Sequence, residues 1–93
     1  MLSKIPIDIE NLDNLTTDKE ILRLGIIAEL DAVNLYEQLA ARTSDKNLKK
    51  ILLDVAKEEK THVGEFQALL LERDKEQDKE LEKGKKEVEK ELK

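Results

Sequence analysis

The fold is decided by residues 18–73, which read DKEILRLGIIAELDAVNLYEQLAARTSDKNLKKILLDVAKEEKTHVGEFQALLLER. Apolar residues recur in this stretch at intervals of three or four, the spacing that places them along one side of an α-helix. Thr43 and Ser44 interrupt the pattern, so the first helix is expected to end near Arg42. The pattern then resumes, and the second helix is expected to continue to about Arg73. A gap this short requires the two helices to form an antiparallel hairpin.

Capping signals support these helix starts. Residues 17–20, Thr-Asp-Lys-Glu, match the capping box, in which a Thr hydroxyl and a Glu carboxylate satisfy the unpaired amides of a first helical turn. The first helix should therefore begin near Asp18. Ser44 offers a similar N-cap for the second helix.

The composition fits one small all-α domain. Of the 93 residues, 42% are charged and 2% aromatic, so a core must come from Leu, Ile, Val and Ala on long helices. Nothing alternates in the manner of a strand. We expect an N-terminal segment (1–16), a helical hairpin (17–73) and a charged C-terminal helix or tail (74–93).

Charge and cysteine content exclude several classes of function. The net charge of −5 comes from mixed acids and bases without a basic cluster, which argues against a nucleic-acid partner. Without cysteine the chain has no disulfide and no thiolate site, so a metal must be held by carboxylates and imidazole. Residues 1–15 carry three acids and no continuous apolar run, so we expect no secretory signal, no membrane partner and a cytoplasmic location.

Each predicted helix has an apolar face with an acid at its centre. Glu29 lies at the middle of the first face and Glu59 at the middle of the second, where His62 follows one turn later. The first face comprises Leu22, Gly25, Ile26, Ala32, Val33, Tyr36 and Ala40. The second face comprises Leu48, Leu52, Val55, Val63, Phe66 and Leu70.

The two central acids should face each other. Glu29 lies 14 residues before Thr43 and Glu59 lies 15 residues after Ser44, so both stand at nearly the same height above the turn. A buried carboxylate needs a cation or a proton, because burying it unpaired costs several kcal/mol. Glu59 and His62, at i and i+3, can bind the same ion.

One hairpin offers only three ligands, which are too few for two metal ions. A twofold axis through the apolar faces doubles them to four carboxylates and two imidazoles, the ligand set of di-iron four-helix bundles. A lone histidine is more often an ordinary interface residue, and only its combination with Glu29 and Glu59 makes His62 a candidate ligand. Tyr36 either hydrogen-bonds a ligand or fills the core, and Glu58 and Glu65 are expected to be solvated.

A second apolar patch lies on the far side of the first helix, around Leu24, Ile27, Leu30 and Leu35. One explanation is a further partner, which would make the assembly larger than a dimer. The other is that the N-terminal residues Ile5, Ile7 and Ile9 cover the patch.

Residues 74–93 are almost entirely charged, so they are expected to form a short docked helix or a frayed tail. Leu81, Val88 and Leu92 are too few to drive packing. Gly84 would weaken a helix there.

The acidic motifs are similar to a known family. Residues 28–37 read Ala-Glu-Leu-Asp-Ala-Val-Asn-Leu-Tyr-Glu, and residues 58–62 read Glu-Glu-Lys-Thr-His. Together they resemble the encapsulated ferritins. Among these, the sequence looks most similar to the archaeal form that is fused to an encapsulin shell protein. The resemblance covers about residues 20–73. It implies a homodimer that completes the four-helix bundle, a ring of dimers (a decamer), and a place inside an encapsulin nanocompartment in the cytoplasm.

The resemblance also implies roles for individual residues. Glu29 would be a terminal ligand, Glu59 the bridging ligand and His62 the imidazole ligand, with Tyr36 beside the catalytic site. Asp31 corresponds to one acid of the family's metal-entry path; otherwise it faces solvent or a subunit contact.

Two positions depart from the best-known bacterial pattern. Ala28 stands where the metal-entry path has a second acid, and Leu35 where a Trp precedes the Tyr. These differences concern the entry route and leave the metal ligands intact.

The expected function is that of a ferroxidase, which oxidises Fe(II) to Fe(III) with O2 at a di-iron site between subunits and supplies iron for storage in the shell. Zn, Mn and Ca are other divalent ions that can occupy such ligands. The alternatives are a rubrerythrin-like di-iron peroxidase and a metal-free helical oligomerisation module.

Overall fold

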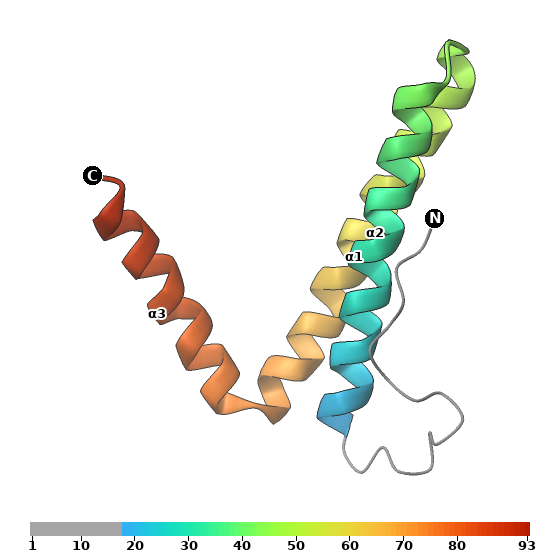
Figure 1. The fold of residues 1–93 in the computed structure, drawn as a ribbon. Helices are drawn as coiled ribbons and strands as arrows, with labels where there is room; N and C mark the ends of the chain where they lie inside the picture. The colour runs from blue at the N-terminus through green and yellow to red at the C-terminus, as the bar shows by residue number, and fades with distance from the viewer. Residues whose placement is uncertain (1–17) are drawn as a thin grey trace.

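The structure, a computed structural model, describes residues 18–93 and consists of three helices (Figure 1). They are α1 (Asp18–Arg42), α2 (Lys46–Arg73) and α3 (Lys75–Glu91). The described part of the chain contains no strand, so the predicted all-α class is confirmed, as are the hairpin and the short C-terminal helix. No helix within residues 18–93 is long and apolar enough to span a membrane.

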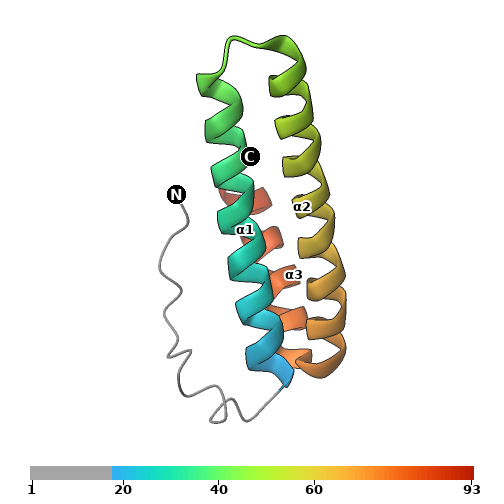
Figure 2. The ribbon, with the colours of Figure 1, turned by 90° about the vertical axis from the view of Figure 1, so that its right-hand side faces the viewer.

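Helices α1 and α2 run antiparallel and side by side, whereas α3 leaves the end of α2 and diverges from the hairpin (Figure 1). In the view turned by 90°, α3 lies behind the plane of the hairpin (Figure 2). The hairpin therefore has one face turned toward α3 and one turned away from it.

The first turn of α1 contains two acids, Asp18 and Glu20. Their negative charges stabilise the helix because they lie at the positive end of its dipole. Thr17 of the predicted capping box lies outside the described residues, as do Ile5, Ile7 and Ile9. The capping box and the proposed N-terminal cover of α1 therefore stay predictions.

The N-cap of α2 is Asp45, so the prediction of Ser44 was wrong by one residue. The Asp45 carboxylate accepts hydrogen bonds from the backbone amides of Asn47 at 2.9 Å and Leu48 at 3.0 Å. Thr43 supports this turn, because its hydroxyl accepts a bond from the Asp45 amide at 3.1 Å. A carboxylate is a stronger acceptor than the neighbouring serine hydroxyl, which explains the choice.

The core of the described residues is a thin seam between α1 and α2. It consists of five buried apolar residues, namely Leu22, Val33, Ala40, Ala56 and Leu70. At one level of the seam Gly25 lets the Phe66 ring pack against the α1 backbone, since a methyl group at Gly25 would lie 3.2 Å from that ring. The seam alone leaves much of the apolar surface of the hairpin uncovered.

Two uncovered surfaces follow from the helical periodicity. We call the one turned away from α3 the open face; its exposed apolar residues are Ile21, Leu39, Leu48, Ile51 and Leu69. We call the one turned toward α3 the groove face; its exposed apolar residues are Ile27, Leu30 and Leu53. Ile27 and Leu30 belong to the predicted second patch, whose other members, Leu24 and Leu35, are half-buried.

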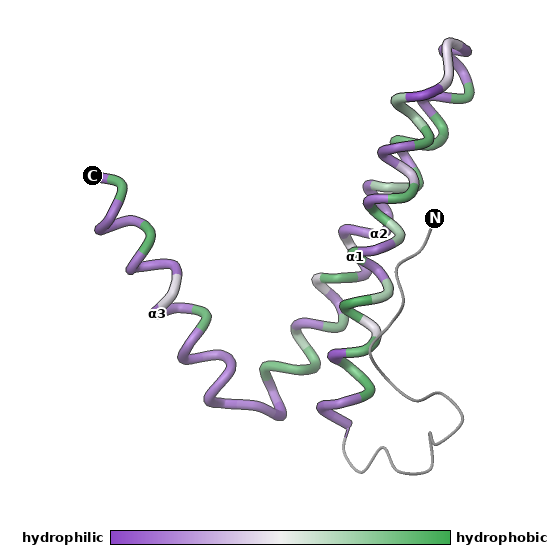
Figure 3. The backbone as a smooth tube through the Cα atoms, in the orientation of Figure 1, coloured by the Kyte–Doolittle hydropathy of each residue, from purple (hydrophilic) through white to green (hydrophobic). Residues whose placement is uncertain are grey.

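Helix α3 is a regular helix through Gly84, not a frayed tail, but it is not docked along the hairpin. Figure 3 shows it mostly hydrophilic, in contrast to the mixed colouring of α1 and α2. Near the joint with α2 it borders a groove of about 330 Å³. The groove is lined by Arg23, Ile26, Ile27, Gln67, Leu70, Gln77 and Leu81.

Candidate metal centre

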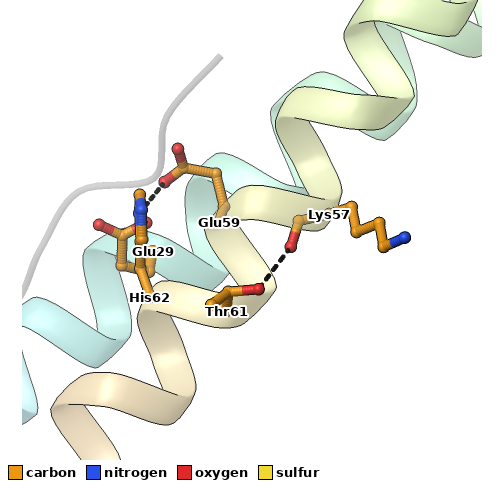
Figure 4. A network of polar contacts seen from close by, with 5 residues as sticks. All are labelled: Glu29, Lys57, Glu59, Thr61 and His62. Carbon is orange, nitrogen blue, oxygen red and sulfur yellow. Dashed lines mark hydrogen bonds and ion pairs between the residues drawn. The ribbon is translucent and has the colours of Figure 1, made fainter.

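Three side chains from the two helices of the hairpin converge on the open face. Glu29 comes from the middle of α1, and Glu59 and His62 come from consecutive turns of α2 (Figure 4). Each offers a ligand atom, and these atoms lie within 4.8 Å of one another. This is the convergence expected from their equal heights above the turn.

The imidazole of His62 lies between the two carboxylates. Its Nδ1 is 3.3 Å from Oε2 of Glu29 and 3.7 Å from Oε2 of Glu59. The contact with Glu29 crosses from α2 to α1, so the group ties the two helices together. The contact with Glu59 follows from the i, i+3 spacing on one helix.

The group is only partly shielded from solvent by its own hairpin. The side chains of Glu29 and Glu59 are each 19% exposed, and that of His62 is 42% exposed. The exposed side of the group belongs to the open face, among the uncovered apolar residues of both helices. A metal ion held here would therefore have protein ligands on one side and an open side facing away from the hairpin.

The two acids are in conflict when no cation is present. Hydrogen bonding to the Glu29 carboxyl group raises the pKa of Glu59 above its usual 4.5, and burial and the negative charge of Glu29 raise it further. The positive charge of His62 acts in the opposite direction without cancelling these effects. A proton held between the acids relieves the repulsion.

His62 is drawn toward its charged form. Burial lowers its pKa, but the hydrogen bond to Glu29 and the negative charges of Glu29, Glu59 and Glu65 outweigh burial and raise the pKa above the usual 6.5. An imidazolium here takes the place that a metal cation would have between the carboxylates. Binding of a divalent ion would release these protons, because ligating carboxylates and imidazoles must be deprotonated.

Comparison with known proteins identifies the family. A family model described as EncFtn-like matches residues 5–88, which is most of the chain. The chain belongs to the EncFtn-like family. The resemblance predicted from the acidic motifs is thereby confirmed.

The EncFtn-like chain has relatives in an archaeon and a bacterium. It is 68% identical over 69 residues to a ferritin-like-encapsulin shell fusion protein of Pyrococcus furiosus, and the aligned residues make up 74% of this chain and 20% of the relative. It is 42% identical over 64 residues to the encapsulin nanocompartment cargo protein EncC of Myxococcus xanthus, which covers 66% of this chain and 49% of the relative. The matches thus span less than half the length of either relative.

A solved structure has the same fold. The crystal structure of the encapsulated ferritin domain from Pyrococcus furiosus matches with a TM-score of 0.76 and 56% sequence identity, over 97% of this chain and 86% of that chain. The match extends beyond the hairpin into residues that the sequence patterns assigned less firmly.

The remaining predicted residues are not part of the three-residue group. Tyr36 is half-buried two turns beyond Glu29 on α1, and its role beside the site stays a prediction. Asp31 is half-buried and does not belong to the three-residue group. Glu58 and Glu65 are exposed, as expected.

The sequence analysis did not predict the electrostatic effect of Glu65 on His62. Glu65 is exposed, yet its charge helps to raise the pKa of His62. The signal was present in the sequence, because Glu65 follows His62 at the i+3 spacing that places two side chains side by side on a helix.

Proposed function

We propose that this EncFtn-like chain is a ferroxidase that oxidises Fe(II) to Fe(III) with O2 at a di-iron site shared between two copies. The convergence of Glu29, Glu59 and His62 on an apolar, partly exposed face carries the proposal. Iron is the substrate, and each Fe(II) gives one electron to O2. Carboxylate oxygens are hard ligands and favour the ferric product.

A second copy is needed because one hairpin holds only half of a di-iron ligand set. A twofold axis through the open face brings a second Glu29, Glu59 and His62 opposite the first, giving four carboxylates and two imidazoles. The 42% exposed imidazole would then be covered by the partner.

The apolar surface around the ligands supports the same arrangement. Ile21, Leu39, Leu48, Ile51 and Leu69 are exposed on the open face. Covering a Leu or Ile side chain is worth about 1.5–3 kcal/mol relative to leaving it in water. Pairing through this face would bury all five in each copy and complete a four-helix bundle.

The proposed roles of the ligands follow the family resemblance. Glu59 bridges the two ions, Glu29 is a terminal ligand and His62 supplies the imidazole, with Tyr36 beside the site. The conflict between Glu29 and Glu59 suits this task, because a cation between them removes the repulsion that now raises the pKa of Glu59.

We propose the same setting for this chain as for its relatives, whose names refer to an encapsulin shell and to nanocompartment cargo. The chain would act inside an encapsulin compartment in the cytoplasm and pass ferric iron on for mineral storage there. The groove face offers a second interface beside the open face, since Ile27 and Leu30 remain exposed on it. Two distinct interfaces per chain permit a ring of dimers, for which we propose a decamer.

The test is iron oxidation by the purified chain and three variants. Fe(II) is added in air, and ferric absorbance is followed in Glu29→Ala, Glu59→Ala and His62→Ala. Each variant loses two ligands from a twofold site, so initial rates should fall by about 100-fold or more. Mutating a residue that only hydrogen-bonds to a metal ligand typically costs about 10–100-fold, and losing the ligands themselves should cost more. Glu58→Ala is the matched control, because it removes an exposed acid adjacent to Glu59.

The outcomes separate the candidate functions. Rates near that of the unmodified chain in all three ligand variants would reject the ferroxidase site. Turnover with hydrogen peroxide but not with O2 would indicate the rubrerythrin-like peroxidase. Association without metal binding or oxidation would indicate the helical oligomerisation module.

A further inference from the structure

The joint between α2 and α3 lacks the residues that usually end helices. Residues 69–79 read LLLERDKEQDK and contain neither glycine nor proline. Most of these residues favour a helix. Even so, α2 ends at Arg73, α3 begins at Lys75, and the chain changes direction at the single residue between them (Figure 1).

That residue, Asp74, has a non-helical backbone and caps both helices. Its φ of −130° and ψ of 87° are outside the helical range. Its amide donates to the Leu70 carbonyl at 2.9 Å, and its carbonyl accepts from the Asp78 amide at 3.2 Å. Its carboxylate accepts from the Gln77 amide at 3.0 Å, which is the N-cap bond of α3.

The other carboxylate oxygen of Asp74 reaches back to the hairpin. Arg23 of α1 donates to it from Nη2 at 2.8 Å, across 51 residues of sequence. Asp74 is the one buried charged residue between 18 and 93, with a side chain 11% exposed, whereas Arg23 is 50% exposed. The Gln77 amide, followed by Arg23, lowers the pKa of Asp74, so its carboxylate is ionised at neutral pH.

A continuous helix would form backbone hydrogen bonds that the bend gives up. In a straight α2–α3 helix, the amides of residues 75–77 would bond to the carbonyls of residues 71–73. The bend satisfies the Gln77 amide through the Asp74 side chain instead. The bent form therefore depends on what the Asp74 carboxylate binds.

We propose that Asp74, bonded to Gln77 and paired with Arg23, is a latch that holds α3 bent over the groove face, and that release of this latch lets α2 and α3 join into one helix from Lys46 to Glu91. In the bent form Leu81 and Arg23 line the same groove. In the straight form Leu81 leaves the groove that it lines together with Ile27. The latch thus decides whether the groove face is partly covered by its own chain.

The test measures the distance between α2 and α3 in solution. The chain has no cysteine, so Lys57→Cys and Lys86→Cys, at two exposed lysines, place one spin label on each helix. The labelled chain is diluted with unlabelled chain, so that only distances within one copy are detected. In a straight helix the 29 residues between the labels correspond to about 43 Å, and the bend brings them closer.

Three changes in this labelled background separate the cap from the ion pair. Asp74→Ala removes both and should shift most of the population to the distance near 43 Å. Asp74→Asn keeps a good N-cap but loses the charge, and Arg23→Gln loses the ion pair alone, so both should broaden the distribution toward the longer distance. Asp78→Ala, an acid one turn into α3 with the same change of charge, is the control and should leave it unchanged.

An unchanged distribution in Asp74→Ala would overturn the latch. If that variant lost helix content by circular dichroism, Asp74→Asn and Arg23→Gln would decide instead, and a distribution in both that matched Asp78→Ala would overturn it equally. A loss of iron oxidation without a change of distance would bear on the metal centre and not on the latch.

Discussion

Two acids of this chain, Glu59 and Asp74, sit in comparable places and have opposite properties. Both are partly shielded from solvent, both lie near a cationic or titratable nitrogen, and both face a residue of α1, Arg23 for Asp74 and Glu29 for Glu59. Yet the pKa of Glu59 is raised and that of Asp74 is lowered. The difference lies in the chemical group that acts most strongly on each carboxylate.

The strongest influence on the pKa of Glu59 is another acid, Glu29, whereas the strongest influence on the pKa of Asp74 is the Gln77 amide, and Arg23 acts in the same direction. Asp74 is thus satisfied by its own chain and holds the joint between α2 and α3. Glu59 is left in conflict unless a proton or a metal ion enters. The comparison shows that a shielded acid facing a second acid points to a ligand site, while one facing donors points to a structural role.

The largest effect should come from adding a divalent metal. Zn(II), which does not change oxidation state, should raise the Tm of the unmodified chain by roughly 10–20 °C at 100 times its Kd, because binding to the folded state then contributes about 2.7 kcal/mol. It should also shift the mass in solution toward dimers or larger assemblies. Asp74→Asn should keep this response and Glu59→Gln should lose it.

Calorimetry and mass measurement with and without Zn(II) provide the check. A protein that stays monomeric at micromolar concentration and melts at the same temperature in chelator and in Zn(II) would contradict the shared site. An equal loss of response in both variants would erase the distinction between the two acids.

Removing each charge in chelator should change stability in opposite directions. Glu59→Gln eliminates the repulsion with Glu29 at nearly constant volume and should raise the Tm of the metal-free protein. Asp74→Ala deletes a helix cap and should lower the Tm by about 5 °C, the usual effect in a domain of this size. Thermal melts monitored by circular dichroism suffice, and two shifts of the same sign would show that Glu59 is structural as well.

The metal-free protein should be more stable in mild acid than at neutral pH. Glu59 and His62 have raised pKa values in the folded chain, so between the unfolded and folded values the folded state binds more protons. Stability therefore falls as pH rises through these windows, which begin at 4.5 for Glu59 and 6.5 for His62. Melting in chelator should occur a few degrees higher at about pH 5 than at about pH 7.5.

Asp74 provides the internal contrast for this pH series. Its lowered pKa means that its contribution is present above 3.8 and is lost only as pH falls below that value. Glu59→Gln should reduce the difference between pH 5 and pH 7.5, and Asp74→Asn should not. A higher Tm at neutral pH in chelator would show that the acids of the metal centre are not in conflict.

The smallest effect is expected at an ion pair that belongs to neither cluster. Lys60 and Glu37 lie 3.0 Å apart, with side chains 60% and 46% exposed. Exposed pairs contribute about 0–1 kcal/mol, so Glu37→Gln should change the Tm by only a few degrees and leave the metal response intact. If Glu37→Gln lowered the Tm as much as Asp74→Ala does, the solvent exposure of a charged group would not predict how much it contributes to stability in this chain.

The sequence predicted the convergence of Glu29, Glu59 and His62, because two local rules determine it. Helical periodicity places Glu29 and Glu59 on apolar faces, and a short turn fixes their heights, so no long-range information is needed. His62 follows from its spacing to Glu59. The structure brings these three residues together.

The end of the second helix near Arg73 was predicted, but the contact of Asp74 with α1 was not, because it depends on a partner distant in sequence. Arg23 is separated from Asp74 by 51 residues, and no glycine or proline marks the joint. One signal was available: Asp74 and Gln77 have the spacing of a capping box. The N-cap of α2 was misplaced by one residue for a different reason: Thr43, Ser44 and Asp45 precede that helix, and each of these residue types can act as an N-cap.

The direction in which α3 leaves the hairpin has a consequence for tethering. Because α3 departs on the side of the hairpin opposite the open face, a polypeptide joined after α3 would start behind the hairpin, away from the open face (Figure 2). Such a fusion could be anchored to a surface while the open face stayed free to pair with a second copy. An attachment made within α1 or α2 on the open face would instead obstruct it, so the far end of α3 is the place to graft a label, a linker or a whole second protein.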